Sequence, residues 1–156
     1  VTIRASLQQE DSSLISRRFM KSEIITVASP KYLKKSGLPK KPTDLTDHQT
    51  ISYGYLKQPK LWMYTDKNGQ PILVNVDSQV TTNSGEMNLA LCIAGKGITR
   101  IPRFHLNDEL TQNKLVELFD DYPQINIDIH LVYPSRKHMS SKVRSFIDFV
   151  IAELGD

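Results

Sequence analysis

Residues 24–30 read Ile-Ile-Thr-Val-Ala-Ser-Pro, and this stretch decides the fold class. A continuous run of apolar and β-branched residues is typical of a strand that is buried on both faces, in a sheet covered by helices. Ser29 and Pro30 then have the residue types of an N-cap and a first helical position. A short helix, ended by Gly37, is therefore predicted directly after the strand. A buried strand that leads at once into a helix indicates an α/β fold.

The flanking sequence continues this mixture of strands and helices. Asn68-Gly69 separates two apolar stretches, 61–65 and 71–76, and this dipeptide predicts a β-hairpin because both residues tolerate positive φ. Alternating apolar and polar residues over 127–133 predict a half-buried strand. Further short strands are predicted at residues 1–5, 51–53, 79–82, 98–102 and 114–119.

Two longer helices are predicted towards the C-terminus. Asn83 and Glu86 have the spacing of a capping box in front of the apolar run 87–94, and Gly95 is expected to end that helix. Ser140 or Ser141 is expected to cap the final helix. Its apolar residues recur at helical spacing, so we expect one face to be mostly buried, comprising Val143, Phe146, Ile147, Val150 and Leu154.

The composition fits one ordinary domain or two small lobes. The chain has 156 residues, of which 39% are hydrophobic, and this content argues against a disordered protein. The single cysteine, Cys92, can form no internal disulfide, so a reducing compartment is expected, most simply the cytoplasm. No apolar run reaches the roughly 18–20 residues of a membrane span. The chain opens in strand-like sequence at Val1, without an initiator Met, and is therefore expected to be part of a longer protein.

The sequence predicts no catalytic residue, no metal site and no cofactor. It contains no nucleophile elbow, no phosphate-binding loop and no dinucleotide fingerprint. The four histidines are scattered without metal-ligand spacing. Cys92 lies among apolar residues of a predicted helix, which favours a small buried side chain over a reactive thiol. An enzyme is therefore the least favoured class of protein.

One strand-to-helix junction has the character of a ligand site. Thr82-Asn83-Ser84-Gly85 places hydroxyl and amide side chains where a strand runs into a helix N-terminus. Backbone N–H groups and the helix dipole favour an anionic group there, such as a carboxylate. In open α/β folds, moreover, ligands gather at the carboxyl ends of strands. The alternative is that this junction, like Ser29-Pro30, is only a helix cap, and the spacing leaves both interpretations open.

Several motifs, in the same order along the chain, resemble the C-terminal part of LysR-type transcriptional regulators. The most extensive is residues 129–149, Ile-His-Leu-Val-Tyr-Pro-Ser-Arg-Lys-His-Met-Ser-Ser-Lys-Val-Arg-Ser-Phe-Ile-Asp-Phe, which resembles the end of these proteins. The first-lobe pattern of the family is similar to residues 27–33, Gly37, Pro39, residues 42–45 and His48. The second-lobe pattern is similar to Asn83, residues 94–98 and Ile101-Pro102. Val1-Thr2-Ile3-Arg4 resembles a family strand that ends in Ile-Arg, so the resemblance covers nearly the whole chain.

The resemblance implies a two-lobe, type II periplasmic-binding-protein-like effector domain, with a small-molecule cleft between the lobes. It implies an incomplete first lobe in residues 1–50, with a crossover near 43–53, and a second lobe in 51–130. Residues 131–156 would form the return crossover and a C-terminal helix that packs back on the first lobe. The implied cleft residues, which would bind a carboxylate-bearing effector, are Arg4, Ser52, Tyr53, Gly54, Thr82, Asn83, Ser84 and Pro102. Arg4 is expected to pair with the carboxylate.

The resemblance also implies partners for the whole protein. A homodimer or tetramer is expected, with the helix at 86–94 as the second-lobe side of the contact. DNA would be bound only through an N-terminal winged helix-turn-helix domain that this sequence lacks, and no membrane partner is expected. A solute-binding protein of a transporter is the alternative function. Because the opening elements of the first lobe are expected to be missing, the strands at 1–3 and 24–27 are predicted to form exposed sheet edges.

Overall fold

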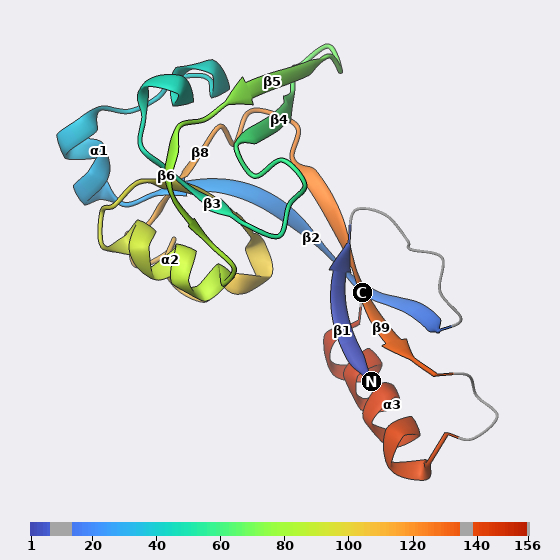
Figure 1. The fold of residues 1–156 in the computed structure, drawn as a ribbon. Helices are drawn as coiled ribbons and strands as arrows, with labels where there is room; N and C mark the ends of the chain where they lie inside the picture. Colours follow the sequence, from blue (N-terminus) through green and yellow to red (C-terminus); the bar gives the residue numbers. More distant parts are fainter. Residues whose placement is uncertain (7–13, 135–138, 156) are drawn as a thin grey trace. The chain divides into compact units, whose positions relative to one another are not determined.

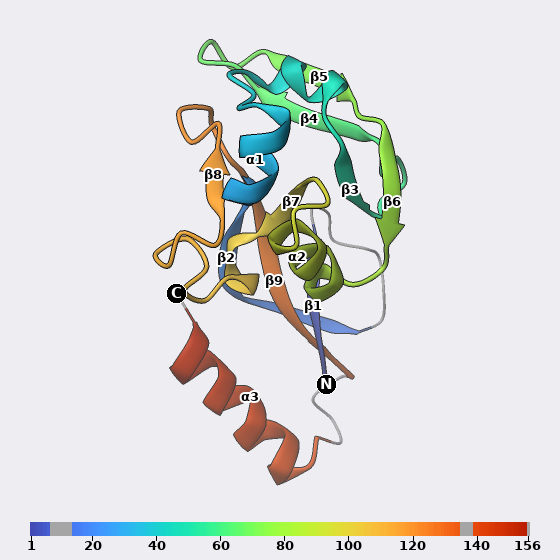
Figure 2. The same cartoon turned by 90° about the vertical axis from the view of Figure 1, so that its left-hand side faces the viewer.

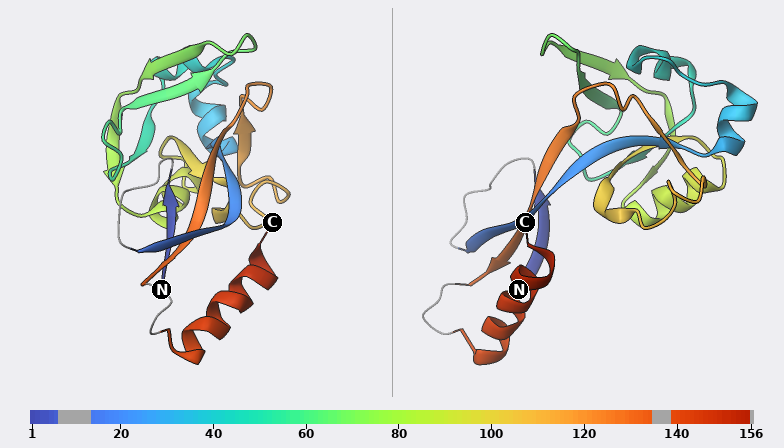
Figure 3. Two further views of the ribbon diagram at one scale, coloured as in Figure 1. Left: turned by 90° about the vertical axis from the view of Figure 1, so that its right-hand side faces the viewer. Right: turned by 180° about the vertical axis from the view of Figure 1, so that it is seen from behind.

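The structure, a computed structural model, describes residues 1–6, 14–134 and 139–155, and it is of mixed α/β class (Figure 1). The chain falls into two units. Unit 1 comprises Val1–Glu23 and Asn126–Asp156, and unit 2 comprises Ile24–Ile125. The long strand β2 (Ile15–Ala28) has residues in both units, and Figure 3 shows it from behind. The lobe boundaries predicted from the sequence, at residues 50 and 130, stay predictions.

Unit 2 is built on a sheet with the strand order β2-β7-β3-β6. Its further strands are β3 (Thr50–Tyr53), β6 (Ser78–Thr82), β7 (Ile98–Pro102) and β8 (Val116–Leu118). β7 and β8 each pair antiparallel with β2, whereas β3 runs parallel to both β6 and β7. The carboxyl ends of β3 and β6 therefore meet at one edge of the sheet, where the chain enters helix α2 (Gly85–Ile93).

The two faces of this sheet are covered by different elements. The antiparallel hairpin of β4 (Leu61–Thr65) and β5 (Pro71–Asn75) belongs to one hydrophobic cluster, with buried Trp62, Tyr64, Val74, Ala28 and Ile98. Helix α2 contributes Cys92 to a second cluster, with Ile25, Val27, Ile51 and Ile101. Figure 1 shows the hairpin and α2 on opposite sides of β3. The residues 25–28 are all buried, which confirms the prediction made from their unbroken run.

Local sequence signals place the turns and helix ends. Ser29 Oγ accepts a hydrogen bond from Tyr32 N (3.3 Å) at the start of α1 (Pro30–Ser36), which follows β2 directly (Figure 2). Gly37 ends that helix with a φ of +87°, and a 3₁₀ helix, η1 (Pro42–Asp47), follows. In the hairpin turn, Asp66 Oδ1 accepts hydrogen bonds from the backbone N–H groups of Asn68 and Gln70, at 2.8 and 2.7 Å. These helix and hairpin predictions are confirmed.

Unit 1 contains β1 (Thr2–Ser6), β9 (Ile125–Tyr133) and α3 (Ser141–Leu154), together with the first part of β2. β1 pairs antiparallel with β9. On β9, Ile127 and Ile129 are buried whereas Asp128 and His130 are half-buried, as the alternating pattern predicts. Ser140 caps α3, its Oγ accepting a hydrogen bond from Val143 N at 3.4 Å.

The prediction for the buried face of the final helix is wrong at two positions. Ile147 and Val150 are buried and Val143 is half-buried, but 46% of Phe146 and 54% of Leu154 is exposed. Phe149, which was not expected on the buried face, is 61% exposed. Helical spacing identifies apolar residues on a helix, but the width of the buried stripe depends on how much surface the packed neighbours supply. In unit 1, the described residues cover only a narrow stripe of α3.

The prediction of an exposed edge at residues 24–27 is also wrong. Ile24–Val27 pair with β7, and Thr26–Ala28 pair with β8 on the other edge of the strand. Local sequence cannot show this, because β7 and β8 come from far along the chain. β1 does lie at the end of the strand order β1-β9-β2, and Ile3 is 53% exposed.

Cys92 is fully buried in α2, where its Sγ lies 3.4 Å from the carbonyl oxygen of Val27. Burial raises the pKa of the Cys92 thiol to about 12. The thiol is therefore protonated at neutral pH, which supports its interpretation as a small buried side chain. Within the described ranges, no helix combines the length and apolar character needed to cross a membrane.

Candidate functional site

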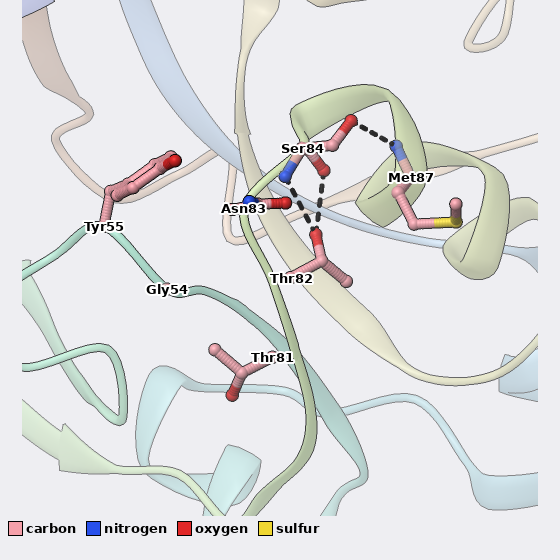
Figure 4. A pocket seen from close by; sticks show the side chains of 7 residues that line it. All are labelled: Gly54, Tyr55, Thr81, Thr82, Asn83, Ser84 and Met87. Atoms are coloured by element: carbon pink, nitrogen blue, oxygen red, sulfur yellow. Dashed lines mark hydrogen bonds between the residues drawn. The ribbon is translucent and has the colours of Figure 1, made fainter.

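A cavity of about 520 Å³ opens at the carboxyl ends of β3 and β6, entirely within unit 2. It is lined by Gly54, Tyr55, Thr81, Thr82, Asn83, Ser84 and Met87 (Figure 4). Strand β6 and the start of α2 supply five of these residues, and the segment after β3 supplies Gly54 and Tyr55. The cavity therefore lies at the strand-to-helix junction that the sequence singles out.

Gly54 brings the end of β3 close to β6. Its backbone N–H donates a hydrogen bond to the carbonyl oxygen of Thr82 at 2.7 Å. A Cβ atom at Gly54 would lie 3.1 Å from Thr81 Cγ2 and 3.4 Å from the Thr82 carbonyl oxygen. To accept a larger residue at this position, the Thr81 side chain would have to shift by a few tenths of an ångström, so β3 and β6 approach closely at Gly54.

Hydrogen bonds within the junction fix the shape of the cavity floor. The hydroxyl of Thr82 lies 2.6 Å from Asn88 Oδ1 and 2.9 Å from the carbonyl oxygen of Ser84, and it accepts a bond from Ser84 N at 3.2 Å. Asn88 is buried in α2, so its amide holds the strand end and the helix together. A buried polar group of this kind is stabilising only when its hydrogen bonds are made.

The residue that caps α2 is Ser84 and not Asn83, so the predicted capping box is wrong by one position. Ser84 Oγ accepts a hydrogen bond from Met87 N at 3.2 Å (Figure 4). The spacing Asn83-to-Glu86 and the spacing Ser84-to-Met87 are equal, and serine and asparagine are similarly good N-caps. The shift leaves the side chain of Asn83 exposed at the cavity, because it is not used to cap the helix.

The cavity lining combines polar, uncharged groups with two apolar side chains. None of the seven lining residues is charged. Tyr55 is 73% exposed and its ring lies 5.7 Å from that of Tyr53 in an edge-to-face arrangement, and Met87 is 52% exposed. The positive end of the α2 dipole points towards this region, which favours one anionic or strongly polar ligand group. The exposed apolar atoms of Tyr55 and Met87 suit a ligand that also has an apolar part.

The structure brings four of the eight predicted site residues together around the cavity, namely Gly54, Thr82, Asn83 and Ser84. Ser52 is buried and its hydroxyl is hydrogen-bonded to Ser78 Oγ. Tyr53 does not line the cavity, but its ring contacts that of Tyr55, which does. Pro102 is not among the lining residues either, and it pairs with Ile24 at the end of β7. Arg4 lies in unit 1, opposite His130 in the β1–β9 pair.

Tyr55, Thr81 and Met87 were missed by the sequence reasoning. Tyr55 and Thr81 directly adjoin predicted residues, so a prediction extended by one position along each segment would have included them. Met87 has no such signal, because an apolar residue in the first turn of a helix is normally a core residue. Only the placement of α2 over the end of β6 exposes it to the cavity.

The comparisons with known proteins define the class. The sequence pattern of the LysR substrate binding domain matches residues 1–155, so this chain belongs to the LysR substrate-binding-domain family. The fold is accordingly of the type II periplasmic-binding-protein-like kind. The regulatory domain of CrgA, a LysR-type transcriptional regulator from Neisseria meningitidis, superposes with a TM-score of 0.86 and 30% identity, over 98% of this chain and 74% of that one.

Two further relatives show how much of a regulator this chain represents. An HTH-type transcriptional regulator of Haemophilus influenzae is 36% identical over 134 residues, which are 86% of this chain and 46% of the relative. The full-length structure of AphB, the Vibrio cholerae virulence activator, has a TM-score of 0.81 and 31% identity, over 96% of this chain and 50% of AphB. The chain thus spans about half the length of the curated relatives it matches. These relatives are transcriptional regulators and not solute-binding proteins of transporters.

Proposed function

We propose that this chain senses a small, carboxylate-bearing effector for a LysR-type transcription regulator, and that it binds the effector in the cavity at the ends of β3 and β6. The observation that carries the proposal is the meeting of Gly54, Thr82, Asn83 and Ser84 around one cavity at the N-terminus of α2. Its volume, about 520 Å³, is in the range of small-molecule sites. An enzyme is not favoured, because the lining offers no nucleophile paired with a base.

In this proposal the carboxylate lies near Asn83 and the first turn of α2, where the helix dipole and the exposed amide attract an anion. The apolar part of the effector contacts Tyr55 and Met87, which are exposed in the free chain. Contacts of the effector with Arg4, Ser52, Tyr53 and Pro102, and its position in a cleft between two lobes, remain part of the proposal.

For the whole protein, we propose a cytoplasmic regulator that is a homodimer or tetramer and that binds DNA through an N-terminal winged helix-turn-helix domain. Helix α2 is the proposed second-lobe side of the subunit contact. The effector acts by binding one arrangement of the protein more tightly than another, and its differential affinity sets the size of the effect on DNA binding.

Ligand-induced thermal stabilisation tests the effector site. Benzoate, butyrate and succinate are each compared with the corresponding uncharged amide, benzamide, butyramide or succinamide. A carboxylate that binds the folded chain raises its Tm in a saturable manner, by mass action, whereas the matched amide raises it less. Asn83→Ala should reduce the shift, and Asn75→Ala, which changes an exposed asparagine of β5 outside the cavity, should leave it unchanged. Equal shifts in both variants would contradict the proposed site.

A further inference from the structure

Tyr55 lines the cavity at the ends of β3 and β6, and most of its side chain is open to water. A tyrosine ring has a large apolar surface, which proteins normally bury in a core or in an interface. The ring of Tyr55 instead contacts only the edge of one neighbouring ring, that of Tyr53, which is also exposed. The two tyrosines therefore present an aromatic surface that a ligand in the cavity can cover.

The backbone around Tyr55 sets the position of this ring. Gly54 N donates a hydrogen bond to the carbonyl oxygen of Thr82 at 2.7 Å, and Leu56 N donates one to the carbonyl oxygen of Tyr53 at 3.5 Å. The second bond closes a four-residue turn in which Gly54 and Tyr55 occupy the two central positions. A tyrosine side chain has only two rotatable χ angles, so a ligand that contacts it orders little further structure. Tyr55 is therefore suited to ligand contact by its position as well as by its exposure.

Met87 supplies a second apolar contact from the first turn of α2. It lines the same cavity and about half of its side chain is exposed. Figure 4 shows Tyr55 and Met87 on opposite sides of the junction formed by Thr82, Asn83 and Ser84. A thioether sulfur makes favourable contacts with aromatic rings, often at the ring edge, and the flexible methionine side chain adapts to the shape of its partner. Both apolar side chains of the lining thus have a specific preference for an aromatic partner.

The polar part of the lining gives these apolar contacts their weight. None of the seven lining residues is charged, so a carboxylate in the cavity interacts with the Asn83 amide and the α2 dipole instead of a cation. These groups attract any small carboxylate about equally. The contacts of Tyr55 and Met87 with the rest of the molecule therefore decide which carboxylate binds best.

We infer that Tyr55 makes this cavity selective for an aromatic carboxylate over a saturated carboxylate of the same size, with Met87 in contact with the same ring. This inference rests on the proposed function and names the class of effector: a flat aromatic ring that carries a carboxylate. A saturated six-membered ring buries at least as much apolar surface, so burial alone gives it no lower affinity. Contacts between aromatic rings are what separate the two, and they correspond to a difference in affinity of about three- to tenfold.

Calorimetric titration of the wild-type chain compares benzoate with cyclohexanecarboxylate, and benzamide with cyclohexanecarboxamide. Benzoate should bind about three- to tenfold more tightly than cyclohexanecarboxylate. Tyr55→Leu should reduce this ratio to about one, mainly by weakening benzoate, whereas Tyr55→Phe keeps the ring and should keep the ratio. Phe149→Leu removes another exposed ring, on α3, and is the matched control that should leave the ratio unchanged.

The methyl signal of Met87 reports the position of the ligand ring. It is followed in ¹H–¹³C NMR spectra of the wild-type chain and assigned with Met87→Leu. Saturating benzoate should shift this signal more than saturating cyclohexanecarboxylate does, because only an aromatic ring produces a ring current. Equal shifts with the two ligands would overturn the placement of the ring against Met87.

The failure of this inference and the failure of the proposed function give different results. If the two ring carboxylates bind the wild type equally well, or if the preference persists in Tyr55→Leu, selection by Tyr55 is overturned and the carboxylate site stands. If no carboxylate binds, butyrate and succinate included, the proposed function falls and the amide pair decides. Tighter binding of benzamide that depends on Tyr55 then supports ring selection without the carboxylate, and equal affinities or no binding overturn it. The wild-type comparison needs no variant, so the outcome does not depend on the folding of Tyr55→Leu.

Discussion

The imidazole of His105 lies against the first residue of α2, so that a Cβ atom on Gly85 would be 3.1 Å from His105 Nε2. His105 belongs to the short 3₁₀ helix η2 (Arg103–His105), and its ring stacks on Phe104 with centroids 4.3 Å apart. Burial lowers the pKa of His105, and the nearby Glu86 carboxylate opposes this shift in part. A neutral imidazole next to the positive end of a helix dipole is favourable, whereas an imidazolium there is not.

The stability of the chain should therefore depend on pH through His105. As pH falls below the unfolded-state pKa of about 6.5, the unfolded state takes up this proton before the folded state does. The stability contributed by neutral His105 is complete above that pH and is lost as pH falls through the lower folded-state pKa. Urea denaturation at several pH values between about 5 and 7.5 measures how the free energy of unfolding changes with pH. His105→Asn should remove the contribution of His105 to this pH dependence. The same pH dependence in the wild type and in the variant would contradict the prediction.

Gly54 should be intolerant of larger residues. In Gly54→Val the new side chain would meet Thr81 Cγ2 and the Thr82 carbonyl, at 3.1 and 3.4 Å for the Cβ atom alone. We expect a loss of about 1–3 kcal/mol of stability from overpacking. Benzoate-induced stabilisation should also be lost as the cavity changes shape. Lys57→Val, at an exposed position of the same loop, is the matched control, and similar behaviour of both variants would argue against close packing at Gly54.

Two neighbouring positions on α3 should differ sharply in their contribution to stability. Ile147 is 4% exposed, so Ile147→Ala should cost about 2–4 kcal/mol through lost burial and a residual cavity. Phe146 is 46% exposed, and Phe146→Ala should cost less than about 1.5 kcal/mol, because much of its surface is in water in both states. Chemical denaturation of the two variants gives the comparison directly. A larger loss for Phe146→Ala would show that another surface covers this side of α3.

Thr82 and Asn88 should act as a pair. The hydroxyl-to-amide distance of 2.6 Å and the burial of Asn88 indicate a strong hydrogen bond behind the cavity. Thr82→Val and Asn88→Ala should each cost about 1–3 kcal/mol, because each leaves a buried polar partner unsatisfied. The double variant should cost less than the sum, with a coupling of about 0.5–1.5 kcal/mol in a double-mutant cycle. Additive losses would show that the two side chains are energetically independent.

The thiol of Cys92 should be inert in the folded chain. It is fully buried and burial raises its pKa to about 12, so almost none of it is thiolate at pH 7. Reaction with 5,5′-dithiobis(2-nitrobenzoic acid) should be negligible under native conditions and should become rapid and stoichiometric in 6 M guanidinium chloride. Rapid labelling without denaturant would mean that α2 opens readily from the sheet.

The sequence by itself determined the elements whose signals are local. The run 24–28, the cap at Ser29 and the Asn68-Gly69 turn specify a buried strand, a helix start and a hairpin, because each depends on neighbouring residues only. The motif order was also enough to predict the family. The ligand site at Thr82-Asn83-Ser84 stays a prediction, and all three residues line one cavity.

The tertiary structure alone decided which surfaces meet. The pairing of β2 with β7 and β8, the exposure of Phe146, and the position of Met87 at the cavity all depend on contacts between segments far apart in the chain. Arg100 is the clearest case. In the sequence it is one polar residue in an apolar strand, and only the packing of the β4–β5 hairpin beside β7 places its guanidinium carbon 4.7 Å from the centroid of the Tyr64 ring and its Nη1 3.0 Å from the carbonyl oxygen of Met63. Burial depends on which layers of the fold pack together, so it cannot be predicted from the local sequence alone.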